Sequence, residues 1–176
     1  ALGALTSGAK NVSIGFESQL YQTDGANNTT LGYKALRNAD NGESDNVAIG
    51  KEAGMNINHA SSDANVLIGS NAGTGGNGPM SGAVVIGANA MNSTDTNTIT
   101  GAVAVGYNAL TALTSGSGNL AVGYQSGLNI TTGADNVGVG EKTIGGSSST
   151  AITGDGNTAL GWLAGTNLEG SANENT

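Results

Sequence analysis

The sequence predicts an all-β fold, a repetitive β-solenoid or β-roll of about ten coils with a period of 17–19 residues, in one segment over residues 1–176. Three observations predict it. A five-residue motif that ends in glycine recurs along the whole chain, bulky and small residues alternate before each of these glycines, and helix signals are almost absent. A unit of this size cannot bury its own apolar side, so the repeats are expected to stack into a rod.

The motif has the form Asn-x-small-aliphatic-Gly, as in NVAIG, NVLIG and NLAVG. Successive motif glycines are 17 to 21 residues apart. The nine full copies end at Gly15, Gly32, Gly50, Gly69, Gly87, Gly106, Gly123, Gly140 and Gly161. A clipped first copy is expected to end at Gly3. Such self-similarity through an entire chain is typical of stacked repeats.

Each copy predicts one short β-strand. The residue three before the glycine is Val, Leu or Thr, the next is mostly small, and the one directly before the glycine is aliphatic. This alternation has a period of two, which indicates a strand with one bulky face. We expect that face to point inward as a ladder, which includes Ile14, Leu31, Ile49, Ile68, Ile86, Val105, Val122, Val139 and Leu160.

Asparagine stands four residues before the glycine in seven of the nine copies. These residues are Asn11, Asn28, Asn46, Asn65, Asn119, Asn136 and Asn157, while Ala83 and Ala102 replace them in the other two. Asparagine tolerates left-handed backbone and bonds to the local chain in turns. In register its amides can also bond one another along the rod. We therefore expect a structural asparagine ladder.

The third residue after the glycine is small, for example Ala35 or Ala53, so it must be tightly packed. Either the opposite wall of the same coil or a neighbouring chain would explain this. The residue directly after the glycine is aromatic in five copies, at Phe16, Tyr33, Tyr107, Tyr124 and Trp162. Because Lys51 and Glu141 take the same place, this position is expected to be at least partly exposed. The aromatic side chains offer a surface for glycan contact, although covering the next coil or a partner subunit is the favoured interpretation.

Composition excludes several classes of function. A net charge of −8 opposes binding to nucleic acid and electrostatic docking on anionic membranes. The sequence has neither cysteine nor an apolar run long enough to insert into a membrane. We expect no enzyme activity, no catalytic residue, no metal site and no cofactor. His59 stands alone in a polar loop, and acidic residues near the asparagines, such as Asp45 and Asp135, lack the fixed spacing of a calcium site.

Copies such as GANNTTLGYKAL, GSGNLAVGYQSG and GDGNTALGWLAG resemble the repeats of phage and virus-like tail-fibre proteins, whose arrays read roughly TGxxNTAxGYxAL. They are similar, more distantly, to the head repeats of trimeric autotransporter adhesins. The resemblance covers essentially the whole chain. It implies a virion tail fibre or an extracellular, cell-surface protein, generally a parallel homotrimer, whose repeats carry no catalytic residue. The copies around Gly87 and Gly106 depart from the pattern because they lack the asparagine.

A thin coil encloses little core, which independently favours association of three chains about an axis. The expected function is a structural fibre shaft or adhesin segment that contributes to attachment to a cell-surface glycan. A single-chain solenoid remains the structural alternative. The functional alternatives are a filament that polymerises head to tail and an ice-binding solenoid, although the threonines do not share one phase.

The chain is expected to be an excerpt of a longer repetitive protein. It begins without Met, and joining its end to its beginning writes NENTALGAL, which restores an NTALG motif at the ordinary spacing of 18 residues. The alternative is that one such match arises by chance in a repetitive sequence.

Overall fold

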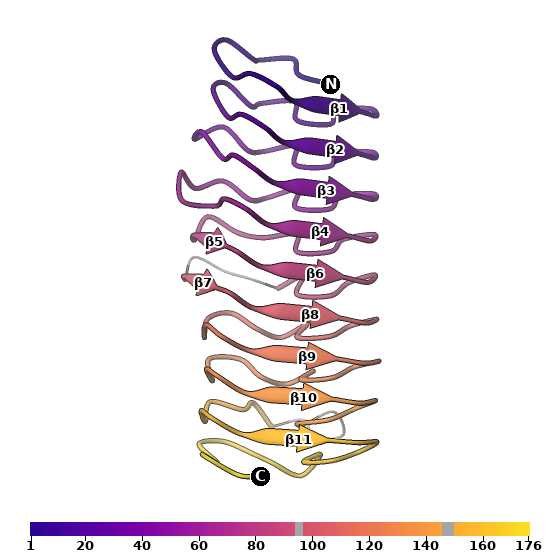
Figure 1. The fold of residues 1–176 in the computed structure, drawn as a ribbon, viewed down its shortest axis with the longest axis vertical. Coiled ribbons are helices and arrows are strands. Elements are labelled where there is room, and N and C mark those ends of the chain that lie inside the picture. The colour runs from indigo at the N-terminus through magenta and orange to yellow at the C-terminus, as the bar shows by residue number, and fades with distance from the viewer. Residues whose placement is uncertain (94–96, 146–149) are drawn as a thin grey trace.

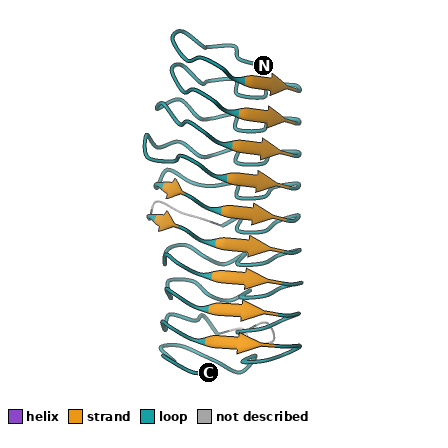
Figure 2. Ribbon diagram, in the orientation of Figure 1, coloured by secondary structure: helices purple, strands orange, loops and turns teal. Residues whose placement is uncertain are grey.

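The computed structural model describes residues 1–93, 97–145 and 150–176. In that part of the chain there are strands, turns and loops but no helix. The chain winds as a parallel β-solenoid into a rod, with the two termini at opposite ends (Figure 1). Figure 2 shows one strand of the long sheet in each turn, joined by longer loops, and a second short strand in two of the turns. The predicted all-β solenoid is therefore confirmed.

One parallel sheet runs the length of the rod, in the order β1-β2-β3-β4-β6-β8-β9-β10-β11. Its strands are three residues long: Val12–Ile14 (β1), Thr29–Leu31 (β2), Val47–Ile49 (β3), Val66–Ile68 (β4), Val84–Ile86 (β6), Val103–Val105 (β8), Leu120–Val122 (β9), Val137–Val139 (β10) and Thr158–Leu160 (β11). Nine strands enclose eight full turns, fewer than the ten coils expected.

The register of the sheet superimposes the motif copies residue by residue. Val47 pairs with Val66, and Ile49 pairs with Ile68. The same alignment holds for the other pairs, so each motif position forms a column along the rod. Insertions and deletions are absorbed in the loops between strands, where they leave the sheet unchanged.

The bulky face of the sheet points outward, so the expectation of an inward aliphatic ladder is wrong. In β3 and β4 the middle residues, Ala48 and Leu67, are fully buried inside the coil. Their neighbours on either side are only partly covered. The interior of so thin a coil accepts mainly small side chains in mid-strand. Alternation in the sequence separates the two faces of a strand, but it does not say which one lies inside.

The core is a narrow column of small and aliphatic side chains. The small residue three after the motif glycine packs inside its own coil, as Ala35 and Ala53 do. Of the two explanations left open for this position, the opposite wall of the same coil is the correct one. Larger buried residues, such as Leu36, Ile57 and Leu110, fill the space between the walls.

The motif glycines turn the chain at the end of each strand and stack closely on one another. Gly50 has a φ of +133°, and a Cβ built on it would lie 2.5 Å from the carbonyl oxygen of Gly69. That separation is far below van der Waals contact, so the column excludes a side chain at every motif glycine that has another stacked after it, from Gly15 to Gly140.

Gly3 does not belong to the column of motif glycines. The amide of Leu2 donates to the carbonyl of Ser18 at 3.1 Å, just as the amide of Gln19 donates to Ala35 at 2.9 Å. Leu2 therefore occupies the same position in its coil as Gln19, which is four residues after Gly15. Gly3 is one residue further along, so it lies outside the column. The expectation that a first copy ends at Gly3 is wrong, because no strand of this sheet precedes it.

A second, two-stranded sheet forms where the motif lacks asparagine. Its strands are Met80–Ser81 (β5) and Ile99–Thr100 (β7), which pair in parallel. They lie just before Ala83 and Ala102, the two alanines of the asparagine column. The amide of Ile99 donates to the carbonyl of Pro79 and that of Gly101 donates to Ser81, both at 2.9 Å.

Candidate functional site

The outer side of the nine-stranded sheet is a continuous apolar surface, which we call the aliphatic face. It consists of the first and third residues of each strand. The first residues are Val12, Thr29, Val47, Val66, Val84, Val103, Leu120, Val137 and Thr158. The third residues are Ile14, Leu31, Ile49, Ile68, Ile86, Val105, Val122, Val139 and Leu160.

The aliphatic face is accessible along its whole length. The exposed fraction is 58% for Ile14, 46% for Leu31 and 78% for Leu160, while the central residues are half-buried by their neighbours in the same column. Strand spacings of about 4.8 Å and rises of about 3.3 Å per residue make the face roughly 38 Å long and 10 Å wide. An apolar strip of about 400 Å² lies in the size range of the largest patches on monomeric proteins, which are often functional.

Aromatic residues flank this face in two clusters. Phe16 and Tyr33 stack with ring centroids 5.6 Å apart, and Tyr107 and Tyr124 stack at 5.5 Å. These four rings and that of Trp162 are 42% to 72% exposed, in line with the partial exposure expected from the sequence. Each of the four stacked rings therefore contacts the ring of a neighbouring coil and still presents apolar area to a partner.

The seven motif asparagines lie in a column inside the coil wall, and all except Asn11 are fully buried. Asn136 shows the pattern of their bonds. Its Oδ1 accepts from the backbone amide of Asn157 at 2.9 Å, and its Nδ2 donates to the carbonyl of Gly154 at 3.0 Å and to Oδ1 of Asn119 at 3.1 Å. Each buried amide thus joins two coils. The column holds the rod together and offers nothing to a ligand.

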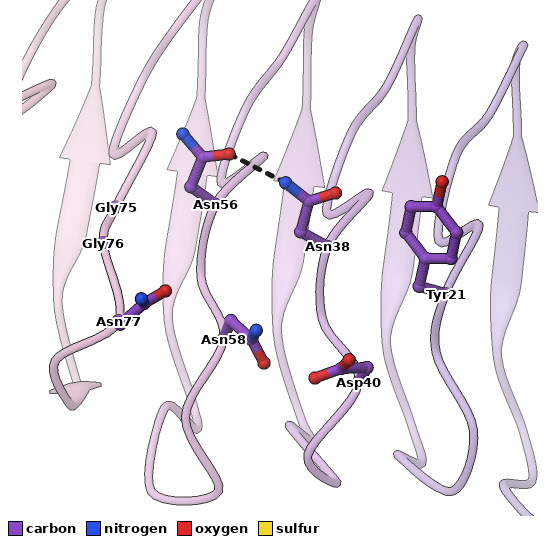
Figure 3. A pocket seen from close by; sticks show the side chains of 8 residues that line it. All are labelled: Tyr21, Asn38, Asp40, Asn56, Asn58, Gly75, Gly76 and Asn77. Atoms are coloured by element: carbon purple, nitrogen blue, oxygen red, sulfur yellow. Dashed lines mark hydrogen bonds between the residues drawn. The ribbon is translucent and has the colours of Figure 1, made fainter.

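A polar groove on the loops was not anticipated from the sequence. It has a volume of about 440 Å³ and spans four coils (Figure 3). Its lining comes from the sixth to eighth residues after successive motif glycines: Tyr21, Asn38, Asp40, Asn56, Asn58, Gly75, Gly76 and Asn77. The sequence does contain a signal for this groove. Polar residues recur at a fixed distance after the motif glycines, within loop segments that otherwise vary in sequence.

Hydrogen bonds fix part of this lining. Nδ2 of Asn38 donates to Oδ1 of Asn56 at 2.9 Å, and Asn41 donates through its side-chain amide to Oδ1 of Asn58. At one end Arg37 lies 4.9 Å from the centre of the Tyr21 ring and donates to the Tyr21 hydroxyl at 3.2 Å. The amides of neighbouring coils therefore stand in preset orientations along the groove.

No group of three or more His, Cys, Asp or Glu residues that could hold a metal occurs in the described part of the chain. Nδ1 of His59 accepts from the amide of Ser61 at 3.1 Å, which is a local loop contact. Asp63 accepts from the amide of Ser44 at 2.7 Å, and Asp155 accepts from that of Ala134 at 2.7 Å. These carboxylates fasten one loop to the next. Within the described residues, no helix is long and apolar enough to cross a membrane.

No protein-family model, curated protein or solved structure matches this chain. The resemblance to tail-fibre repeats therefore stays an expectation from the motif.

Proposed function

We propose that this chain is a structural fibre segment that associates with two further copies of itself, side by side and in parallel, through the aliphatic face. The observation that carries the proposal is the outward position of two uninterrupted columns of Val, Ile, Leu and Thr along nine strands. Covering such a strip removes apolar surface from water, which stabilises the assembly by about 25 cal/mol per Å².

The shape of the face favours three chains. The strip is only about 10 Å wide, because each strand has three residues. Around a three-fold axis, each narrow strip meets both neighbouring chains, and equivalent coils lie at the same height. Ile49 of each chain then meets the same residue of the other two in a ring. The exposed aromatic clusters border the strip and extend the apolar contact.

A rod of this kind suits the shaft of a virion tail fibre or of a cell-surface adhesin, which holds a receptor-binding part away from its base. The features that support this role are the regular coil, the aliphatic face and the polar loops. A role in the shaft requires neither catalysis nor a cofactor. A filament that grows head to tail is the alternative, and it would place its contacts at the ends of the rod.

Single cysteines test the proposed interface, because the described chain has no cysteine of its own. Ile49→Cys places one thiol per chain on the aliphatic face, and a three-armed maleimide of short reach is then added. We expect a covalent trimer on a denaturing gel. Ser61→Cys is the matched control, because Ser61 is exposed in the loop between β3 and β4. The control should remain a single labelled chain at the same protein concentration.

Labelling of Ile49→Cys without any cross-linked species would overturn the proposed interface. Cross-links that form equally well from Ser61→Cys would show random collision and would also overturn it. Images of the same sample by negative-stain microscopy separate short rods from long filaments. Filaments that lengthen with concentration, without cross-linking at Ile49→Cys, would instead support end-to-end growth.

A further inference from the structure

The polar groove contains hydrogen-bonding groups that the protein itself leaves free. Within the described residues, Nδ2 of Asn56, Nδ2 of Asn58, the side-chain amide of Asn77 and the carboxylate of Asp40 make no hydrogen bond. Asn77 and Asp40 are exposed, whereas Asn56 and Asn58 are half-buried in the wall. Figure 3 shows these side chains along the loops of neighbouring coils, with Tyr21 at one end and Gly75 and Gly76 near the other.

We propose that this groove binds a neutral oligosaccharide that lies along the rod. A sugar hydroxyl both donates and accepts hydrogen bonds. Amide N–H groups from Asn56, Asn58 and Asn77 would donate to such hydroxyls, and the Asp40 carboxylate would accept from them. The ring of Tyr21 is 44% exposed and supplies an apolar surface for one sugar face.

The repeat of the coil supports an extended chain of sugars. The lining residues recur at the same two phases in successive coils, which are about 4.8 Å apart. That spacing is close to the advance per residue of an extended polysaccharide. A ligand along the rod therefore meets at least one polar side chain in each of the four coils. Gly75 and Gly76 carry no side chains, which leaves the far end of the groove open for further sugar units.

The charges around the groove favour a neutral ligand. The guanidinium of Arg37 is already paired with Glu17 at 2.8 Å and with Tyr21, so it is not free to bind an anion. Asp40 is the single carboxylate of the lining, which is too few oxygen ligands of this charge for calcium. None of the lining residues belongs to the aliphatic face, so this inference does not rest on the proposed trimer.

Binding is tested by titrating the intact chain with cellohexaose, maltohexaose and the hexamer of N-acetylglucosamine, followed by calorimetry and by NMR. We expect one of these neutral hexasaccharides to bind and to shift the side-chain amide signals of Asn56, Asn58 and Asn77. The double variant Asp40→Ala and Asn77→Ala should weaken binding at least about tenfold, since it removes two contacts. The matched control is Asn167→Ala, an exposed asparagine outside the groove.

Absence of binding by all three hexasaccharides would overturn the proposal. Binding that survives unchanged in the double variant, or that shifts only signals outside the groove, would overturn it as well. Failure here is distinguishable from failure of the trimer. Ile49→Asp alters the aliphatic face alone, so it should leave the hexasaccharide affinity unchanged whether or not the chains associate.

Discussion

Ala48 and Ile49 are adjacent in β3, yet their side chains lie on opposite sides of the coil wall. Ala48 is fully buried inside the solenoid, whereas Ile49 is partly exposed on the aliphatic face. Because every strand of the main sheet repeats this arrangement, folding of the coil and association of the chains depend on different residues of the same motif.

Replacing these two residues separates folding from assembly. Ala48→Asp puts a carboxylate into the closed interior without a partner, so we expect loss of the β-sheet signal in circular dichroism. Ile49→Asp should keep that signal but abolish association, because its carboxylate stays in water in a single chain and is buried only in the assembly. Intact association of Ile49→Asp would show that the aliphatic face is not the interface.

Asn136→Ala should strongly destabilise the rod. The change leaves the amide of Asn157 and the carbonyl of Gly154 without their partners, and buried groups left unpaired cost about 1–3 kcal/mol each. We expect the free energy of unfolding to fall by about 3 kcal/mol, measured by urea denaturation. Asn167→Ala, at an exposed position, serves as the control and should change it by less than about 0.5 kcal/mol.

Because Glu43 is buried, we expect the chain to become less stable as the pH rises, which is unusual for a carboxyl group. Its side chain is buried, and burial raises the pKa of the carboxyl above its ordinary value of 4.5. The folded chain therefore holds this proton more tightly than the unfolded chain does. The resulting stabilisation is complete below about pH 4.5 and is lost as the pH rises through the raised pKa.

Glu43→Gln removes this titration and keeps a similar shape. The variant should melt at a higher temperature than the parent chain at pH 8, and the difference should shrink towards pH 4. Glu141→Gln, at an exposed position, is the matched control and should show no such trend. Equal melting temperatures of Glu43→Gln and the parent chain at pH 8 would contradict the account of this site.

Gly50→Ala should destabilise the chain more than Gly161→Ala, although both glycines close a motif. Both positions have positive φ, but a Cβ at Gly50 meets the carbonyl of Gly69, whereas a Cβ at Gly161 has nothing within 4 Å. Steric overlap of this kind costs roughly 1–3 kcal/mol beyond the backbone strain that the two variants share. Equal losses of thermal stability would show that the glycine column is not close-packed.

The repeat predicted the solenoid, because the spacing of the motif glycines and of the short alternating runs gives the length of one coil directly. It did not predict the direction of the strand faces. Val47 and Ile49 have the composition of a core, and only the small size of the coil interior decides that Ala48 lies inside. Propensity and alternation are properties of a single strand, whereas the choice of the inner face depends on what the opposite wall leaves free.

The exposed aromatic position and the polar groove also differ in how far the sequence predicted them. The exposed aromatic position was accessible to sequence reasoning because Lys51 and Glu141 share it with Tyr33. The polar groove was not predicted, because its residues come from four coils and lie in loop segments whose sequences differ from coil to coil. Asn38 and Asn56, for example, are 18 residues apart and meet through one hydrogen bond.

The molar mass of the chain in solution, measured by light scattering, tests the central claim most directly. If the aliphatic face joins three copies, the mass should be three times the 17.0 kDa of one chain, and Ile49→Asp should reduce it to that of one chain. A mass of one chain for the unaltered protein, at concentrations well above micromolar, would contradict the assembly and leave a self-contained solenoid.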